Sequence, residues 1–337
     1  MSDFCLVTGA TGFIGGHLVE RLVKTGHRVR CLARPTSDTQ TLERLGVEIA
    51  QGDLTDPVSI GCAAAGATHI LHCGALVSDW ATVREISQIN VGGTRHVMQA
   101  ALQAGVTRVI HISSTDVYGH PKGLRDIDES QPPSRFSNWY SRTKLEAESE
   151  VRRAASTGAV QAVILRPATI YGPGSVNVVG EVAKAVRARN MLLIDHGRAV
   201  AGLCYIDNLV QAATLALSDQ AAAGQTFNVT DGLDITWGQF VADLAQGLGS
   251  PPPRLSLPYP VAHRLGMAME QSYRLLRSAA GLRTPPLLSR QAVDVMGRDQ
   301  SFSNARIRQR LGWEPRVGYE SGLRSTLDWL IATDRAS

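Results

Sequence analysis

Two short motifs carry side chains suited to moving a proton and holding an oxygen atom. Tyr140 and Lys144 lie four residues apart in the sequence YSRTK, a spacing that places both on one face of a helix. A nearby ammonium favours the phenolate form of a tyrosine, so the pair suits acid–base chemistry near neutral pH. Ser114, in the sequence SST after a predicted strand, could hydrogen-bond a substrate oxygen. Taken singly, the spacing also fits an amphipathic helix, and the serines also fit the end of a strand.

A glycine-rich turn comes directly after the first predicted strand. Residues 8–15 read TGATGFIG and open a helical pattern. Gly9 and Gly12 permit a tight turn and a close approach of the backbone to a pyrophosphate, and Gly15 permits close packing of the helix on the strand. The start of the helix adds unpaired N–H groups and the positive end of its dipole. The segment therefore predicts a dinucleotide site that needs no lysine. An ordinary turn between strand and helix is the alternative.

The ends of the second and third predicted strands bear on which dinucleotide binds. An acidic residue after the second strand holds the ribose 2′-hydroxyl of NAD, whereas an arginine nearby accommodates the 2′-phosphate of NADP. Here that position is Ala33 and the next residue is Arg34, which favours NADP(H) and leaves NAD(H) as the alternative. Otherwise Arg34 is a solvated loop residue. Asp53, after the third strand, is expected either beside the adenine or at the cap of a helix that starts near Pro57.

Alternating strand and helix patterns position these motifs. Strands are expected at residues 4–8, 29–33, 47–51, 69–73, 108–112 and 160–166, and helices at 14–24, 83–104 and 139–155. Beyond residue 178 the pattern is mixed, with helices near 178–189 and 208–217 and strands at 191–194, 203–205 and 226–229. The order predicts an α/β protein, a Rossmann-type doubly wound parallel sheet with a smaller mixed C-terminal substrate lobe. We expect the dinucleotide-binding domain to cover 1–175, with return elements near 203–230, and the substrate-binding lobe to cover most of 176–337.

The composition indicates a folded protein without disulfides or a membrane span. The chain has 337 residues, of which 44% are hydrophobic and 19% charged, so a large core can form. Its five cysteines stand singly, without CxxC pairs or a metal-ligand spacing, and are expected to be reduced core thiols in a cytoplasmic protein. No metal site is predicted. The first residues lack the basic start of a secretory signal, and glycine and histidine interrupt the longest weakly polar stretch, 60–77.

Positive charge concentrates towards the C-terminus. The formal net charge is +4, but residues 254–316 contain 11 arginines, no lysine and four acidic residues, a net +7 that leaves −3 elsewhere. No aromatic-interleaved basic motif accompanies these arginines, so an acidic small molecule or solvent is a simpler partner for them than nucleic acid.

Together the motifs resemble the extended short-chain dehydrogenase/reductase family, to which NAD-dependent epimerases and dehydratases also belong. The resembling segments are TGATGFIG, SSTDVYG at 113–119, YSRTK and RPATIYGPG at 166–174, and the similarity extends over nearly the whole chain. It implies that Tyr140 is the general acid/base, that Lys144 binds the nicotinamide ribose and lowers the pKa of the tyrosine, and that Ser114 orients the substrate oxygen. It also implies hydride transfer between nicotinamide C4 and a carbinol carbon of the substrate.

The resemblance extends the set of expected cofactor contacts. Asn90, in the sequence NVGGT, and the Arg166-Pro167 turn match family positions that line the cofactor. The residues expected at the cofactor are Gly9, Thr11, Gly12, Phe13, Ile14, Gly15, Arg34, Asp53, Leu54, Ala75, Asn90, Lys144, Arg166 and Pro167.

Within the family, the C-terminal half resembles the 3β-hydroxysteroid dehydrogenase-like and dihydroflavonol reductase-like branch, which includes bacterial reductases of long-chain β-keto acids. The similarity lies in LSR at 288–290, GRDQSF at 297–302 and the segment 305–315. It implies an NAD(P)-dependent oxidoreductase that acts on a hydroxyl or ketone of a lipophilic substrate, steroid-like or a long-chain β-keto acid.

Two other functions remain as alternatives. Sugar-nucleotide epimerases and dehydratases of the family usually carry an arginine before a Tyr-Val-Asp-like element, where it grips the diphosphate. Here Ala201 takes that place, and Arg198 could substitute from a shifted register. The alternative from another class is a non-catalytic dinucleotide-binding redox sensor. The presence of Ser114, Tyr140 and Lys144 argues against it.

A helix expected over residues 261–280 has three interpretations. One face is predicted to be apolar and the opposite face largely charged, the apolar positions being Val261, Leu265, Met269 and Leu276 and the charged ones Arg264, Glu270, Arg274 and Arg277. The apolar face packs on the core, closes over an apolar substrate as a lid, or rests on a membrane as a peripheral contact. The expected partners are thus a small-molecule substrate, a membrane surface and a second copy in a homodimer, with no nucleic acid.

Overall fold

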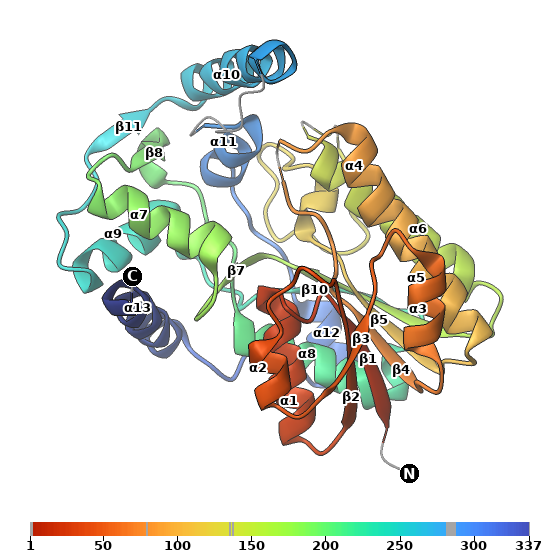
Figure 1. Ribbon diagram of the computed structural model, residues 1–337. Helices are drawn as coiled ribbons and strands as arrows, with labels where there is room; N and C mark the ends of the chain where they lie inside the picture. Colours follow the sequence, from red (N-terminus) through yellow and green to blue (C-terminus); the bar gives the residue numbers. More distant parts are fainter. Residues whose placement is uncertain (1–2, 79, 135, 137, 281–287, 337) are drawn as a thin grey trace.

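A seven-stranded parallel sheet forms the centre of the protein (Figure 1), in the order β10-β6-β5-β4-β1-β2-β3. The computed structural model describes residues 3–78, 80–134, 136, 138–280 and 288–336. The strands of this sheet are β1 (Phe4–Thr8), β2 (Arg28–Ala33), β3 (Glu48–Gln51), β4 (His69–His72), β5 (Arg108–Ile112), β6 (Gln161–Pro167) and β10 (Thr226–Val229). Strand order reverses between β1 and β4, which creates a crevice at the carboxyl ends of these strands. The predicted doubly wound sheet is confirmed.

Helices cover both faces of this sheet. α1 (Phe13–Lys24) and α8 (Ile206–Ser218) pack together on one face, and α3 (Pro57–Ala64), α5 (Gly93–Gln103) and α6 (Trp139–Ala155) cover the other. Successive strand residues point to opposite faces, so Leu6 belongs to the core on the α3 side and Val7 to the core on the α1 side. Burial on both faces explains the continuous apolar runs of these strands.

The strands of the C-terminal lobe are shorter than those of the central sheet. Two parallel two-stranded sheets pair β7 (Thr169–Tyr171) with β9 (Leu203–Tyr205) and β8 (Leu192–Ile194) with β11 (Leu255–Leu257). The helices of this part are α7 (Glu181–Arg187), α9 (Trp237–Gly247), α10 (Tyr259–Ala280), α11 (Arg290–Gly297), α12 (Ala305–Leu311) and α13 (Tyr319–Ala336). β10 and α8 return to the central sheet and its covering layer.

Most elements expected in the first half are present, with ends shifted by one or two residues. β1, β5 and α6 coincide with their predicted ranges. The helix expected over 83–104 is interrupted: α4 (Val83–Ser87) runs into a π-helical turn, Gln88–Gly92, before α5 begins. α2 (Gln40–Arg44), α9 and α11 to α13 are not among the elements predicted from the sequence.

α10 turns a different face inward from the one predicted. Ala262 and Glu270 are buried, whereas Val261 and Leu265 are 51% and 45% exposed. A Cβ on Gly266 would lie only 3.3 Å from the backbone N of Arg290, so the helix packs closely there. The interpretation that Val261 and Leu265 pack on the core is therefore wrong.

The buried charge on this helix has a partner. Glu270 accepts hydrogen bonds from the backbone N and the Nε of Arg290, each at 2.8 Å. Met269 is partly buried. The remaining positions of the predicted faces, Arg274, Leu276 and Arg277, concern side chains outside the described part of the chain.

The cysteines do not all lie in the core. Cys5, Cys31 and Cys204 are buried, but Cys62 is exposed and Cys73 is partly buried, so the prediction of five core thiols is wrong for these two. Burial raises the pKa of Cys5 and of Cys31 to about 12, which makes both thiols unreactive. Across the described ranges, no helix is both long and apolar enough to span a membrane.

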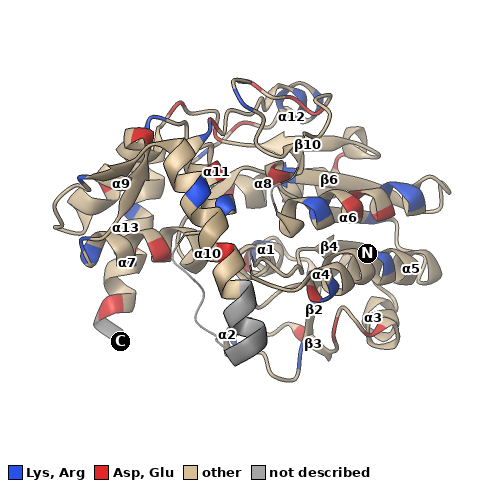
Figure 2. Cartoon of the chain, turned by 90° about the horizontal axis from the view of Figure 1, so that it is seen from above, with Lys and Arg blue, Asp and Glu red and all other residues tan. Residues whose placement is uncertain are grey.

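Much of the positive charge near the C-terminus is paired. Acidic segments lie beside basic ones in this part of the chain (Figure 2). The ion pairs are Arg290–Glu270, Arg298–Asp294, Arg306–Glu129 and Arg308–Glu314. Pairing reduces the positive field that a nucleic acid would need.

Candidate active site

The loop after β1 requires glycine at two positions. Gly9 has a left-handed φ of +69°, and a Cβ on it would lie 2.6 Å from the backbone N of Gly74 at the end of β4. A Cβ on Gly15 would lie 2.1 Å from the carbonyl oxygen of Gly9, so α1 approaches the loop more closely than any side chain allows. Gly12 caps α1 without a side-chain acceptor. Backbone atoms pack closely around this helix start, so the loop fits a dinucleotide pyrophosphate.

A cavity of about 290 Å³ opens beside this loop, at the carboxyl ends of β1, β2 and β4. Seven of the residues expected at the cofactor line it, namely Gly9, Thr11, Gly12, Arg34, Asp53, Leu54 and Ala75. Ala33, predicted at the strand end that selects the dinucleotide, also lines the cavity. Seven other lining residues were not predicted, namely Leu32, Ser37, Gly52, Cys73, Gly74, Leu76 and Ile89. Most of these seven adjoin predicted residues at strand ends. Ser37 and Ile89 carry no such signal.

Two opposite charges face this cavity at its β2–β3 end. Arg34 is exposed, and across the described residues its guanidinium makes no hydrogen bond or ion pair. Asp53 accepts hydrogen bonds from the N and Oγ1 of Thr55, at 2.8 and 2.6 Å. These bonds, with Arg34 nearby, lower the pKa of the Asp53 carboxyl. The side chain that caps α3 is Asp56, which accepts from Val58 N, so the alternative of Asp53 as that cap is wrong.

Lys144 and Ser114 both lie at the carboxyl end of β5. Lys144 is buried, and its Nζ donates a hydrogen bond of 2.6 Å to the carbonyl of Ile112, the last residue of the strand. Burial lowers the pKa of this lysine to about 8, although Glu148 opposes the shift. Ser114 follows two residues later and caps the 3-10 turn Thr115–Tyr118, where its Oγ accepts from Asp116 N at 3.1 Å.

Tyr140 lies one helical turn before Lys144, at the start of α6. Its side chain is partly buried. The helix begins there because Asn138 accepts a hydrogen bond of 2.8 Å from Ser141 N. The fold thus places Ser114 and Lys144 at the end of β5, next to the glycine loop across β4, with Tyr140 one helical turn before the lysine.

Arg166 lies away from the cavity, inside a buried polar network. Its guanidinium makes two hydrogen bonds to the Glu148 carboxylate, at 2.7 and 2.8 Å, and one of 2.8 Å to the Tyr118 hydroxyl. Ser113 also donates to Glu148, at 2.6 Å. The network joins β5 and α6 behind Ser114, and the contact of Arg166 with the cofactor stays a prediction. Pro167 ends β6 beside it.

Asn90 also acts on the backbone of the site. It is buried in the π-helical turn, where its amide oxygen accepts from Leu76 N at 2.7 Å and its Nδ2 donates to Leu76 O at 3.1 Å. The same Nδ2 donates to Thr143 Oγ1 at 3.2 Å. Asn90 thus fastens the cavity-lining segment after β4 to the helix of Tyr140 and Lys144. Phe13, Ile14 and Gly15 form the first turn of α1 and do not line the cavity.

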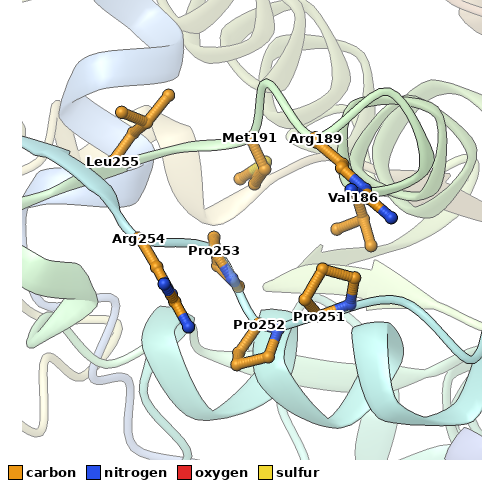
Figure 3. Close-up of a pocket in the computed structure, with 8 residues that line it drawn as sticks. All are labelled: Val186, Arg189, Met191, Pro251, Pro252, Pro253, Arg254 and Leu255. Carbon is orange, nitrogen blue, oxygen red and sulfur yellow. The ribbon is translucent and has the colours of Figure 1, made fainter.

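A second cavity lies in the C-terminal lobe (Figure 3). It measures about 360 Å³ and is bordered by the end of α7, the start of β8 and the prolines before β11. None of the predicted site residues lines it. The described residues also contain no group of three or more His, Cys, Asp or Glu side chains that could hold a metal ion.

Comparisons with known proteins agree with this site. The sequence model of the NAD dependent epimerase/dehydratase family matches residues 5–230. The chain belongs to this family. It is an NAD(P)-dependent enzyme of the extended short-chain dehydrogenase/reductases, and the resemblance drawn from its motifs is confirmed.

Similar proteins cover almost the full length of the chain. The 2-alkyl-3-oxoalkanoate reductase of Stenotrophomonas maltophilia (strain K279a) is 32% identical over 326 residues, which are 95% of this chain and 97% of that protein. The 4-hydroxy-2-methyl-3-oxo-4-farnesyl-3,4-dihydroquinoline-1-oxide ketoreductase of Stigmatella aurantiaca is 30% identical over 318 residues, 94% of this chain and 93% of the relative. The solved structure of MoeE5 in complex with UDP-glucuronic acid and NAD is 25% identical, with a TM-score of 0.76 over 100% of both chains.

Proposed function

We propose that this protein is an NADP(H)-preferring oxidoreductase that interconverts a hydroxyl and a ketone on a lipophilic substrate, steroid-like or a long-chain β-keto acid. The observation that carries this proposal is the placement of Ser114 and Lys144 at the end of β5, with Tyr140 one helical turn before the lysine, beside a loop suited to a dinucleotide. A redox sensor without chemistry would need no such arrangement. A bound nicotinamide would supply the redox chemistry as donor or acceptor of a hydride.

Three side chains have separate roles in the transfer of the proton and the binding of the substrate oxygen. Tyr140 gives a proton to the substrate oxygen during reduction and takes it back during oxidation. The positive charge of Lys144 favours the phenolate of that tyrosine, because an ammonium stabilises a nearby anion. Ser114 holds the substrate oxygen by a hydrogen bond and steadies the charge that develops on it.

The preference for NADP(H) rests on the cavity end formed by β2 and β3. Ala33 is buried at the end of β2, where a carboxylate would otherwise hold a ribose 2′-hydroxyl. Arg34 next to it is exposed, lines the cavity and has its donors available for a 2′-phosphate. Because Asp53 remains ionised nearby, it offsets part of this positive charge.

A lipophilic substrate is supported at the other end of the crevice. Ala201 is fully buried in the main core, so its position offers no surface for an arginine that would pair with a diphosphate. The two similar reductases described above are, by name, enzymes acting on keto groups of alkyl or farnesyl compounds. Both supports favour a ketone with a large apolar part.

A sugar-nucleotide epimerase or dehydratase is the second candidate function. It is favoured by the similarity to MoeE5, solved with UDP-glucuronic acid and NAD. Arg198 is exposed three residues before Ala201 and remains a candidate partner for a diphosphate.

The deciding experiment compares two ligand series on one protein preparation. Ketones of increasing chain length are assayed with NADPH and with NADH by nicotinamide absorbance, and a uridine diphosphate sugar is titrated by calorimetry. We expect kcat/KM to rise with chain length, because roughly 25 cal/mol is gained per Å² of apolar surface removed from water. Micromolar binding of the nucleotide sugar without such a rise would establish the epimerase instead.

A further inference from the structure

One side chain of the C-terminal lobe contacts two separate segments of the candidate active site. Gln291 is the second residue of α11 and is 8% exposed. Its Nε2 donates a hydrogen bond of 3.1 Å to Asp116 Oδ2, and its Oε1 accepts one from Asn138 Nδ2. Asp116 and Asn138 lie 22 positions apart in the sequence and on different elements, so the amide of Gln291 bridges them.

Each bridged residue is built into the segment of a residue with a proposed catalytic role. The backbone N–H of Asp116 donates to Ser114 Oγ at 3.1 Å, and Asp116 lies two residues after that serine. Asn138 lies two residues before Tyr140 and caps the helix that carries it. The distance between the Ser114 hydroxyl and the Tyr140 phenol therefore depends on two segments that meet at Gln291.

A second glutamine supports the cluster from the same lobe. His120 lies 3.3 Å from Asp116 Oδ1 through its Nε2, and its Nδ1 lies 3.1 Å from Gln300 Oε1. His120 is buried and holds a left-handed φ of +53°, a conformation that costs a non-glycine residue free energy. The surrounding contacts must hold this conformation in place, so the cluster is rigid.

An amide satisfies Asp116 and Asn138 together, and its Nε2 also lies 3.4 Å from His120 Nε2. Asp116 needs a donor and Asn138 Nδ2 needs an acceptor, and a glutamine side chain supplies one of each. A leucine would leave both buried groups without this partner. A glutamate would keep the acceptor but set a carboxylate against Asp116, and two carboxylates so close share a proton.

We propose that Gln291 is a positioning residue that fixes Ser114 relative to Tyr140 and so couples the substrate lobe to the chemistry. The inference rests on the proposed catalytic roles of Ser114 and Tyr140. In this role α11 affects the reaction through Gln291, although Gln291 itself needs no contact with substrate or cofactor.

The first variant removes the bridge. Gln291→Leu should lower kcat about a hundredfold, the scale expected when reacting groups are displaced by about an ångström, with little change in the Kd of the dinucleotide. Val293→Ala is the matched control, because Val293 is fully buried on the same helix and touches neither Asp116 nor Asn138 in a hydrogen bond. It should lower stability without this loss of kcat.

The second variant tests the pH dependence of kcat, which would not change if residue 291 only packed against its neighbours. Gln291→Glu should be poorly active near neutral pH and recover at least tenfold in relative kcat towards pH 5, where one proton shared by the two carboxyl groups restores the donor. The groups facing Asp116 are His120, Lys144 and Ser114: burial raises the pKa of Asp116, and these three oppose the shift. His120 Nε2 also lies 3.4 Å from Gln291 Nε2, so the pH profile of Gln291→Glu is compared with that of Gln291→Leu, which keeps His120 and adds no carboxylate.

The outcomes separate the inference from the proposed function. If the wild-type protein reduces no ketone, the proposed function falls. The inference is then judged without substrate, by titrating Tyr140 as the difference in tyrosinate absorbance between each protein and its Tyr140→Phe form. A Gln291→Leu protein with an unshifted Tyr140 titration, or with more than half of the wild-type kcat, overturns the inference. A pH-independent loss in Gln291→Glu does so as well.

Discussion

The two halves of the crevice hold their functional groups in different ways. On the side of the central sheet, Gly9, Gly15 and Lys144 are fixed by backbone contacts and burial that leave no room to move. On the side of the C-terminal lobe, α10 exposes Val261 and Leu265, and the contacts to the chemistry run through a few glutamine side chains. The site is therefore fixed by backbone packing on one side and by a few side-chain hydrogen bonds on the other.

The largest effect expected on the rigid side comes from Tyr140→Phe. Removing the phenol should lower turnover by about 10²–10⁴-fold, the usual contribution of a general acid–base group. The Kd of the dinucleotide should stay nearly unchanged, because the glycine loop binds it. Steady-state turnover and calorimetry measure the two quantities.

Tyr319→Phe is the control for loss of a tyrosine hydroxyl. Its hydroxyl donates to Asp243 at 2.7 Å within the C-terminal lobe, so this variant should lose about 1 kcal/mol of stability and keep its turnover. A Tyr140→Phe protein that keeps more than about a tenth of wild-type turnover, with chemistry limiting the rate, would remove Tyr140 from the mechanism.

The glycine loop offers a matched pair of substitutions. Gly15→Ala sets a methyl group 2.1 Å from the Gly9 carbonyl oxygen and should weaken dinucleotide binding more than about tenfold by displacing the loop. Gly16→Ala meets its nearest neighbour, Ala10 O, at an ordinary 3.6 Å and should bind normally. Calorimetric Kd values, with circular dichroism as the check of folding, measure both. Equal affinities in the two variants would show that the tight loop is not needed for binding.

These positions also show which features of the site can be predicted from the sequence. The strands of the central sheet can be predicted from their apolar runs. The glycine spacing can be recognised because the backbone geometry allows no other residue at these positions. Arg166 and Asn90 are placed near the site by their motifs, but their hydrogen-bond partners, Glu148 and Leu76, come from other elements that only the fold brings together.

Helix α10 shows a different limit. Periodicity states which residues share a face, but not which face meets the protein. Gly266 permits close contact with α11, and Glu270 finds Arg290 there, so the small and polar face is the buried one. The role of Gln291 could not be predicted from the sequence either, because no neighbouring residue in the sequence indicates the partners of its amide.

The charge of Lys144 predicts a dependence of stability on pH. Its pKa is about 8 in the folded protein, below the usual value of 10.5, because of burial. Below pH 8 both folded and unfolded chains carry the proton, and the cost of the buried charge is fully present. Between pH 8 and 10.5 only the unfolded chain keeps it, so this cost disappears as pH rises.

The corresponding test compares wild type with Lys144→Met in urea at pH 7 and pH 10. The free energy of unfolding of the wild type should gain roughly 2–3 kcal/mol relative to the variant over this range. Lys184→Met, which removes an exposed lysine paired with Glu181, should show no such trend. A constant difference for Lys144 would mean that this amine is not desolvated.

The cofactor preference depends on a single exposed charge. Arg34→Ala should narrow the gap between NADPH and NADH binding by about 1–3 kcal/mol, the scale of hydrogen bonds to a charged group, and Ala33→Asp should favour NADH. Arg44→Ala on α2 removes the same charge outside the cavity and should leave the gap intact. Wild-type protein that binds both dinucleotides equally, or NADH more tightly, contradicts the assignment.

The smallest effect is expected where the lobe is least constrained. Leu265→Ser should change the free energy of unfolding by less than about 0.5 kcal/mol, because this side chain is 45% exposed, whereas Leu22→Ala in the fully buried core should cost about 2–5 kcal/mol. A larger loss for Leu265 would mean that the outer face of α10 is covered.

The same Leu265→Ser variant separates the two interpretations left for this face of α10, a lid and a membrane contact. A lid predicts a lower kcat/KM for long-chain ketones and an unchanged value for short ones, since only a long chain reaches the leucine. A membrane contact predicts weaker partitioning into anionic vesicles, with Arg264 beside it supplying the charge, and no change in kcat/KM for ketones in free solution.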